Sequence, residues 1–233
     1  MAHFKIAEFP HHLHLDFFAP KAGNAFGLEV ARELSAIQKK YKKWNKPLVV
    51  SSAHPTLFCS GGNLSDYKKL KGKAPGLKVN REITKHLADF GHWPVVKLAL
   101  IEGDVLGGGL EWLAHFDFRW SVPHALFCFW QRRIGLAPGW GGGAVWGSRI
   151  GEEKLRGLLL ESEMFSAAAA LRAGLIDRII TGWKIRESVI DWARRMDDPT
   201  VRTLLAWNAK KEDLIFQKLW MGPEHKAALA RWR

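Results

Sequence analysis

Residues 103–111 have the sequence GDVLGGGLE, and the three consecutive glycines, Gly107 to Gly109, stand where a predicted strand gives way to a predicted helix. Because glycine has no side chain beyond a hydrogen, a ligand can approach the backbone N–H groups of this turn directly. The N–H groups at the start of a helix are unpaired, and the helix dipole favours negative charge beside them. On its own the turn fits a phosphate cradle, an oxyanion hole or a tight packing site. It is not a P-loop, since no Gly-Lys-Ser/Thr follows.

Residues 58–64, with the sequence FCSGGNL, form a second glycine-containing turn between a predicted strand and a predicted helix. Short apolar runs at 47–52 and 95–101 precede the two turns, and such runs are typical of strands covered on both faces. Upstream, residues 13–17 alternate between apolar and polar side chains and predict a half-buried strand. Residues 28–44 carry apolar side chains at helical spacing and predict an amphipathic helix.

The second half of the chain continues the alternation of strands and helices. Helices are predicted at 141–150 and 152–160. Ser166 is placed to cap a further helix that ends at Gly174. A short strand is predicted at 175–180. Alternating elements of this kind favour a parallel α/β core.

After Gly182 the pattern is helical to the end of the chain, with breaks at Pro199 and Pro223. We therefore divide the chain into an α/β core over residues 1–181 and a C-terminal helical region over residues 182–233.

The composition narrows the class of protein. Of the 233 residues, 47% are hydrophobic and 25% are charged, which is ordinary for a globular domain. No apolar run approaches the roughly 20 residues that span a bilayer. Residues 1–10 lack a basic segment followed by an apolar core, so we expect a cytoplasmic protein with no membrane partner. Cys59 and Cys128, the only cysteines, are too few for a disulfide framework and lack metal-ligand spacing.

A group of histidines, His11, His12 and His14, raises the question of a metal site. His12 and His14 alternate with Leu13 and Leu15, so an exposed strand face explains them more simply. We expect no metal in this protein.

Taken in order, these segments resemble the enoyl-CoA hydratase/isomerase (crotonase) superfamily. The resemblance covers nearly the whole chain and rests on Asn24-Ala25-Phe26 after Pro20-Lys21, the turns at 58–64 and 103–111 with Asp117, IGLAPGWGGG at 134–143, FSA at 165–167 with AGLI at 173–176, FQKLW at 216–220 and PEHK at 223–226. It implies an α/β fold of the crotonase (ClpP-like) type, a spiral of strand–strand–helix repeats with two roughly perpendicular sheets. Relatives form trimers or dimers of trimers through their C-terminal helices, so we expect a homotrimer or hexamer.

The resemblance places the backbone N–H groups of Gly62 and Gly108 in an oxyanion hole. Chemistry at the α- or β-carbon of an acyl-CoA passes through an enolate whose negative charge lies on the thioester oxygen. Two fixed donors at about 2.7–3.1 Å stabilise that charge without the reorganisation that water would need. Glu111 matches one of the two catalytic glutamates of the hydratases and is expected to act as general acid/base. The alternative for Glu111 is a carboxylate that only complements the helix dipole.

The second hydratase glutamate should lie four residues before Gly135, and this chain has Gln131 there. An amide can hold a water but cannot exchange a proton near neutral pH, so full hydration of an enoyl thioester is expected to be weak. Three reactions stay open: isomerisation of a double bond, decarboxylation of an alkylmalonyl-type acyl-CoA, and residual hydration with Gln131 positioning the water. The runs FDFR at 116–119 and PGWGG at 138–142 resemble the alkylmalonyl-CoA decarboxylase branch of the superfamily.

Coenzyme A enters as part of the substrate, and no separate cofactor is implied. By the resemblance, Lys21 contacts the nucleotide portion of CoA, although a solvated lysine explains it equally well. Arg132 and Arg133 are candidates for binding a substrate carboxylate, or for facing solvent or CoA. The other residues expected at the acyl-CoA site are Ala25, Ser60, Gly61, Asn63, Leu64, Gly107, Pro138 and Gly139, with Tyr67, Trp130 and Trp140 as candidates for the acyl pocket.

The net charge of +12 suits the phosphates of CoA and equally a nucleic acid. Residues 39–46, KKYKKWNK, interleave lysines with aromatic residues, and one branch of the superfamily binds AU-rich RNA through lysines on a helix. The simpler interpretation is that lysines at the end of a helix complement its dipole and stay solvated. A catalytically inactive scaffold is a third hypothesis, motivated by Gln131.

Overall fold

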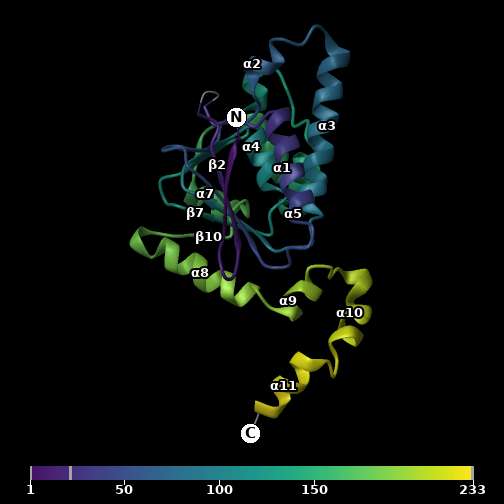
Figure 1. Cartoon of the computed structure of the whole chain (residues 1–233). Helices are drawn as coiled ribbons and strands as arrows, with labels where there is room; N and C mark the ends of the chain where they lie inside the picture. Colours follow the sequence, from purple (N-terminus) through teal and green to yellow (C-terminus); the bar gives the residue numbers. More distant parts are fainter. Residues whose placement is uncertain (1, 21–22, 232–233) are drawn as a thin grey trace.

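The computed structural model describes residues 2–20 and 23–231, and the described chain contains two β-sheets (Figure 1). The six-stranded sheet has the order β1-β2-β3-β5-β7-β10, and the four-stranded sheet has the order β4-β6-β8-β9. The larger sheet consists of β1 (Phe4–Glu8), β2 (Leu13–Phe17), β3 (Leu48–Ser52), β5 (Lys97–Ile101), β7 (Phe118–Ser121) and β10 (Arg178–Ile179). The smaller sheet consists of β4 (Leu57–Cys59), β6 (Asp104–Leu106), β8 (Leu126–Cys128) and β9 (Phe165–Ser166).

Successive strands alternate between the two sheets, which gives the chain a spiral course. β3, β5 and β7 pair in parallel in the larger sheet. The strands that follow them in sequence, β4, β6 and β8, pair in parallel in the smaller sheet. Helical segments then intervene before the chain returns to the larger sheet. These are the strand–strand–helix repeats predicted from the sequence.

Most helices lie outside the spiral, and one lies inside it. α1 (Leu28–Lys40) and α3 (Lys73–Gly91) pack against each other (Figure 1), whereas every residue of α4 (Gly108–Leu113) is buried. The other helices are α2 (Leu64–Tyr67), α5 (Gly142–Ile150), α6 (Glu152–Glu161), α7 (Ala167–Ala173), α8 (Ile185–Met196), α9 (Pro199–Leu204), α10 (Glu212–Leu219) and α11 (Pro223–Arg231), with 3₁₀ turns η2 (Trp130–Ile134), η3 (Gly182–Lys184) and η4 (Ala209–Lys211). Over the described ranges, none of the helices combines the length and apolar character needed to cross a membrane.

Trp112, in the buried helix α4, lies at the centre of the main hydrophobic core. Its ring is fully buried. Centroid distances from this ring range from 4.9 Å for Phe26 to 6.4 Å for Phe90, and the other phenylalanine rings around it are those of Phe4, Phe17, Phe58 and Phe116. Aromatic side chains contribute the largest apolar areas to a core, so these contacts tie α4 firmly to strands of both sheets.

The opposite face of the larger sheet is covered by α8. Val49, Leu98 and Trp120 of the sheet form a second cluster with Val189 and Trp192 of α8. The helix that follows the spiral is therefore packed onto the sheet as part of the body of the molecule.

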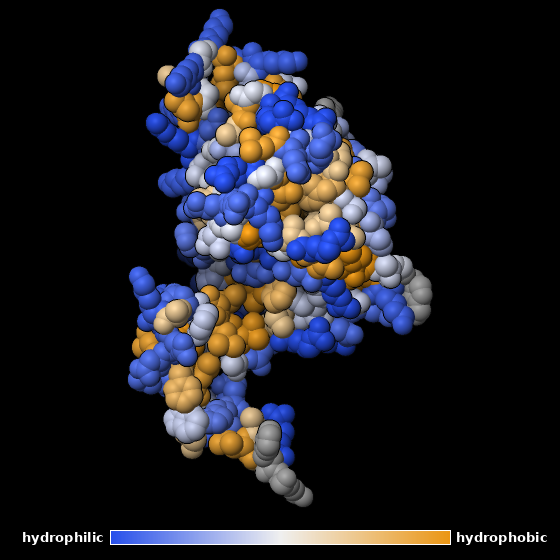
Figure 2. All heavy atoms as spheres, turned by 180° about the vertical axis from the view of Figure 1, so that it is seen from behind, coloured by the Kyte–Doolittle hydropathy of each residue, from blue (hydrophilic) through white to orange (hydrophobic). Residues whose placement is uncertain are grey.

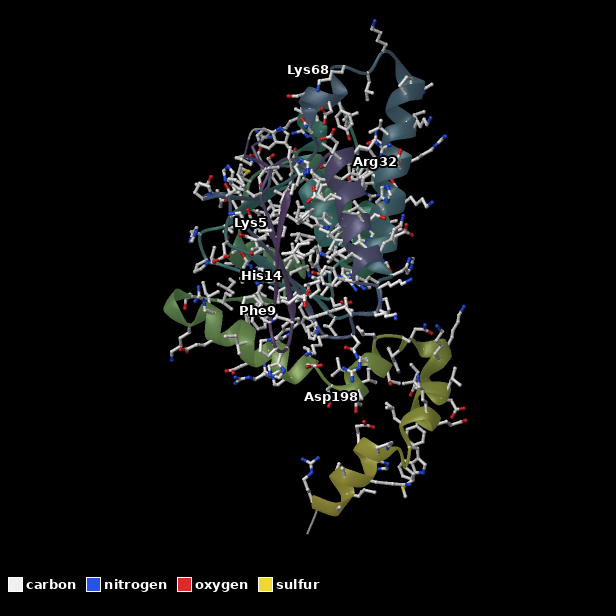
Figure 3. The ribbon with its side chains drawn as sticks, in the orientation of Figure 1. Lys5, Phe9, His14, Arg32, Lys68 and Asp198 are labelled. Atoms are coloured by element: carbon white, nitrogen blue, oxygen red, sulfur yellow. The ribbon has the colours of Figure 1, made fainter. Side chains whose placement is uncertain are left out.

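His12, directly before β2, is less exposed than the alternation predicts. His12 is only 5% exposed, its ring stacks on Phe9 at 4.7 Å, and burial lowers its pKa to about 4. On the same face, His14 Nε2 lies 2.8 Å from Ser51 Oγ, which donates to Asp16 at 2.9 Å. The ring of His14 also lies 6.2 Å from that of Phe9 (Figure 3). The half-buried strand predicted from the alternation is found, with His14 and Asp16 of intermediate exposure. The expectation of an exposed face is wrong at His12, which Phe9 and residues of α8 cover.

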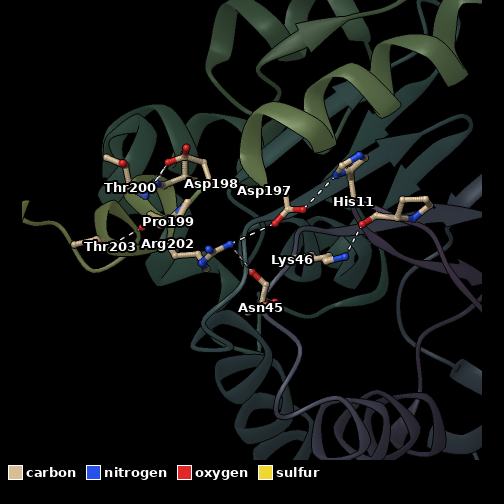
Figure 4. A network of polar contacts seen from close by, with 11 residues as sticks. His11, Asn45, Lys46, Asp197, Asp198, Pro199, Thr200, Arg202 and Thr203 are labelled. Carbon is tan, nitrogen blue, oxygen red and sulfur yellow. Dashed lines mark hydrogen bonds and ion pairs between the residues drawn. The ribbon is translucent and has the colours of Figure 1, made fainter. Parts of the chain in front are cut away.

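The helices after α8 form a C-terminal arm, residues 199–231, that projects from the body (Figure 1). Polar contacts hold its base (Figure 4). Asp197 lies 3.3 Å from His11 Nδ1 and accepts from Arg202 at 3.3 Å, while Arg202 also donates to the backbone oxygen of Asn45 at 3.4 Å. The arm is thus attached mainly at its first helix.

Apolar side chains of the arm face solvent (Figure 2). Trp207 is 52% exposed, and Phe216 and Trp220 are each 57% exposed. They line a groove of about 990 Å³ between α9, α10 and α11. An exposed apolar surface of this extent is typical of an interaction site.

Predicted elements are found, with some ends shifted. The helix expected over 28–44 ends before Tyr41, and the rings of Tyr41 and Trp44 pack against the main core from the turn that follows. The strand expected over 175–180 is reduced to the short β10. Ser166 caps α7 as predicted, because its hydroxyl accepts the N–H of Ala169 at 3.3 Å.

Candidate active site

A cavity of about 610 Å³ lies where the two glycine turns meet, between α2, α3, α4 and the segment before α5. Its lining includes these residues singled out in the sequence: Ser60, Gly61, Gly62, Leu64, Tyr67, Gly107, Gly108, Glu111, Trp130, Gln131, Gly139 and Trp140. Ala25, Asn63 and Pro138 are not among the lining residues. Asn63 instead caps α2 by accepting the N–H of Ser65. Lys21 lies outside the described residues.

The two glycine turns are in direct contact. A Cβ atom at Gly61 would lie 2.8 Å from the backbone oxygen of Leu106 and 3.2 Å from the backbone nitrogen of Gly108. Gly61 also has φ +96°, a conformation that side chains rarely adopt. Any other residue at 61 would therefore separate the turns, which explains the glycine.

The N–H groups of Gly62 and Gly108 are the donors expected to form an oxyanion hole. Gly108 is the first residue of α4, where helix geometry leaves the N–H without an intrahelical acceptor. The neighbouring groups are engaged: Phe26 donates to the oxygen of Gly61 at 2.7 Å, and Gly107 donates to the oxygen of Cys128 at 2.8 Å. Within residues 2–20 and 23–231, neither Gly62 nor Gly108 has an acceptor for its N–H.

Glu111 is buried, and both its carboxylate oxygens accept hydrogen bonds. Oε2 accepts the backbone N–H of Trp140 at 2.7 Å, and Oε1 accepts the backbone N–H of Gly139 at 3.1 Å. Burial raises the pKa of Glu111, and the N–H groups of Trp140 and Gly139 oppose this rise. The side chain therefore does more than complement the dipole of α4, because it also fixes the segment before α5.

Gln131 stands beside Glu111 in the cavity. Its Nε2 lies 3.4 Å from Glu111 Oε1, at the long end of a hydrogen bond. Its Oε1 is buried without a donor in the described chain. The cavity thus pairs one carboxylate with one amide that has a free acceptor.

Asn80, on α3, is a cavity residue that the sequence analysis missed. Its Oδ1 accepts from the hydroxyl of Tyr67 at 2.9 Å and from the indole Nε1 of Trp140 at 2.8 Å. Its Nδ2 donates to the oxygen of Gly76 at 2.9 Å. A lone asparagine within a helix carries no sequence signal, and its partners come together only in the folded chain.

Arg132 and Arg133 point away from the cavity, so the expectation that they bind a substrate carboxylate is not supported by their positions. Arg132 donates to the backbone oxygen of Glu161 at 3.1 Å. Arg133 donates to the oxygen of Ser162 at 2.8 Å and pairs with Glu163 at 3.1 Å. Arg132 binds the last residue of α6 and Arg133 binds the two residues after it, and neither arginine lines the cavity.

No cluster of three or more His, Cys, Asp or Glu side chains that could hold a metal ion is found among the residues that the structure describes. His12 and His14 lie on one face with their rings 5.8 Å apart and contact Phe9 and Ser51 as described above.

The spiral and its glycine-lined cavity define the class of protein. Residues 13–211 match the sequence model of the Enoyl-CoA hydratase/isomerase family, and the chain belongs to this family. The fold agrees: the crystal structure of enoyl-CoA hydratase from Bacillus anthracis superposes with a TM-score of 0.88, covering 98% of this chain and 95% of that chain at 18% identity. The crotonase fold expected from the sequence is confirmed.

Among curated proteins, the chain is similar to ethylmalonyl-CoA decarboxylases. Ethylmalonyl-CoA decarboxylase from Xenopus laevis is 33% identical over 165 residues, which cover 70% of this chain and 55% of that protein. Ethylmalonyl-CoA decarboxylase from Gallus gallus is 27% identical over 227 residues, which cover 89% of this chain and 76% of that protein. The chain therefore spans about half of the length of the frog relative that it matches.

Proposed function

We propose that this chain decarboxylates an alkylmalonyl-type acyl-CoA by stabilising a thioester enolate. The bond between the α-carbon and the carboxylate breaks, carbon dioxide leaves, and the electron pair moves onto the thioester oxygen. The N–H groups of Gly62 and Gly108 stabilise the negative charge there. The α-carbon then takes up one proton, which gives the saturated acyl-CoA.

The pairing of Glu111 with Gln131 carries this proposal. Hydration of an enoyl thioester needs two groups that exchange protons, and this cavity offers one carboxylate beside an amide. Loss of carbon dioxide generates the enolate without a base, so a single carboxylate suffices. The name of the relatives, ethylmalonyl-CoA decarboxylase, points to the same reaction.

Glu111 is the proposed donor of the proton that the α-carbon of the enolate takes up. Burial raises the pKa of this carboxyl group, so a larger fraction is protonated near neutral pH than for a free glutamate. The orphan Oε1 of Gln131 is an acceptor for a protonated carboxyl group if the amide turns over. A base that takes a proton and returns it would also serve double-bond isomerisation, which is the second candidate reaction.

The substrate is bound as a CoA thioester by the glycine turns. By resemblance alone, Lys21 is assigned to the nucleotide portion of CoA, and Asn63 to the loop that holds the pantetheine and adenine ends. The C-terminal arm is proposed to join copies of the chain into a homotrimer or hexamer, since its apolar groove needs a partner to be buried. The hypothesis of RNA binding is weakened because Tyr41 and Trp44 pack against the core. Their rings are not presented for stacking on bases.

The test is mass spectrometry of acyl-CoAs incubated with the protein in heavy water. The panel contains ethylmalonyl-, 2-enoyl- and 3-enoyl-CoA, with a Glu111→Ala variant beside the wild type. We expect ethylmalonyl-CoA to lose carbon dioxide and gain one deuterium. Added water would indicate hydration, a shifted double bond with deuterium would indicate isomerisation, and unchanged thioesters would contradict an enzymatic role.

A further inference from the structure

The indole of Trp140 lies directly against the glycines of the proposed oxyanion hole. A Cβ atom at Gly108 would clash with the ring, 2.6 Å from Cη2 and 2.9 Å from Cε3. A Cβ atom at Gly62 would lie 3.5 Å from Cζ2 of the same ring and 3.1 Å from the ring of Tyr67. Both turns thus need glycine partly because two aromatic rings occupy the space of a side chain.

The position of Trp140 is fixed from both ends of the residue. Its backbone N–H donates to Glu111 Oε2 at 2.7 Å, and its indole Nε1 donates to Asn80 Oδ1 at 2.8 Å. The ring also packs on Phe26 with a centroid distance of 5.8 Å, and only 4% of the residue is exposed. The backbone of Trp140 is held by one hydrogen bond and its ring by another and by a buried contact, so the ring cannot swing aside without breaking the indole hydrogen bond and this contact.

We propose that the Trp140 indole is a fixed stop that limits the length of the acyl chain accepted beside Gly62 and Gly108, so that the site takes short-chain acyl thioesters. Asn80 is the positioning residue that holds the stop. The proposal rests on the proposed acyl-CoA function and adds the substrate class to it. The thioester oxygen must lie at the two N–H groups, so the acyl chain starts next to this ring and meets it within a few carbons.

Trp130 provides a matched comparison within the same cavity. It lines the cavity, but its ring stacks on the guanidinium group of Arg133 at 4.5 Å, and Arg133 is directed to Ser162. A Cβ atom at Gly107 would lie 3.7 Å from the Cβ of Trp130, an ordinary van der Waals distance, whereas a Cβ atom at Gly108 would clash with the ring of Trp140. Trp130→Val therefore removes the same ring without removing the proposed stop.

The experiment measures binding of saturated acyl-CoAs by isothermal titration calorimetry, with CoA alone as the baseline. The probes are acetyl-, butyryl-, hexanoyl- and octanoyl-CoA, which can be neither decarboxylated nor hydrated. For the wild type we expect affinity to fall about tenfold or more at the chain length that meets the ring. In Trp140→Val this fall should move to a longer chain, and in Asn80→Leu it should become shallower. In Trp130→Val it should stay at the wild-type length.

Trp140→Phe repeats the test with a smaller change in volume in case Trp140→Val does not fold. An unchanged chain-length profile in the Trp140 variants would overturn the proposal, and so would an equal shift in Trp130→Val. A wild-type protein that binds none of the acyl-CoAs would refute the proposed function itself. Binding with an unchanged profile would refute only the stop.

Discussion

Among single residues, Glu111 combines two tasks that substitution can separate. Its carboxylate is the proposed proton donor, and it also accepts the N–H groups of Gly139 and Trp140. In Glu111→Gln, we expect turnover to fall about 100- to 10,000-fold because the proton is lost. The unfolding free energy should fall by about 1–3 kcal/mol, because the amide NH₂ faces one of the two backbone donors.

The pH dependence provides the second part of this prediction. A protonated Glu111 is required, so wild-type turnover should decrease as pH rises through the raised pKa of this group. The residual turnover of Glu111→Gln should be flat over the same range. A sloping profile in the variant would assign the proton to another group.

Gln131 distinguishes this cavity from one with two carboxylates, and Gln131→Glu restores the second. The new carboxylate would lie beside Glu111, where Gln131 Nε2 is now 3.4 Å from Glu111 Oε1. Two carboxylates this close cannot both ionise readily, so one stays protonated. We expect the variant to gain the ability to add water to a 2-enoyl-CoA. The measurement is the decrease of the enoyl absorbance with time. Gln131→Leu introduces a side chain with neither an exchangeable proton nor a charge, so this variant should gain no hydration activity.

At the scale of elements, a buried histidine directly before β2 makes the stability of the fold depend on pH. His12 has a pKa of about 4 in the fold against 6.5 as the reference. The unfolded chain therefore takes up a proton between these values that the folded chain does not. The unfolding free energy must fall as pH drops from 6.5 towards 4.

His12→Phe keeps a ring on Phe9 and removes this titration. The measurement is urea unfolding of both proteins at pH 7 and at pH 4.5. Between these pH values, His12→Phe should lose less unfolding free energy than the wild type, by about 1–3 kcal/mol. Burial also lowers the pKa of His115 to about 4, so the stability of the variant should still depend on pH to some extent. The exposed His124 serves as control, and an equal effect of His124→Phe would contradict the assignment.

The elements that sequence patterns predict are those with local signals. β3 and β5 lie in short, mostly apolar runs, and the glycine turns, Glu111 and Gln131 are recognisable within a few residues of chain. α3 was not predicted, because Pro75 and Gly76 interrupt its first turn. Proline is tolerated there, since the first N–H groups of a helix have no partner anyway.

The remaining parts of the site depend on contacts between distant segments. The Glu111 carboxylate binds backbone groups 28 and 29 residues away, and Asn80 binds the indole of Trp140 60 residues away. A residue of any type other than proline offers a backbone N–H, so no pattern of side chains marks those of Gly139 and Trp140 as partners of Glu111. The burial of His12 was missed for a related reason, because α8 and Phe9 cover β2 only in the folded chain.

For the whole molecule, the C-terminal arm offers an apolar groove that an isolated chain leaves in water. If copies assemble through this arm, Phe216→Lys combined with Trp220→Lys should dissociate them, since buried unpaired charges are costly in an interface. Sedimentation velocity would show the mass falling towards 26.4 kDa, that of one chain. Lys218→Glu, on the same helix, should leave the mass unchanged. A wild type that is already monomeric would contradict the proposed assembly.

Trp112 follows Glu111 directly in α4 and is surrounded by phenylalanine rings from β1, β2, β4 and α3. The helix that carries the carboxylate therefore cannot loosen while the rest of the core stays intact. Heating should not produce a folded but inactive protein. The temperature at which turnover is irreversibly lost should coincide with the midpoint of the calorimetric unfolding transition of the core.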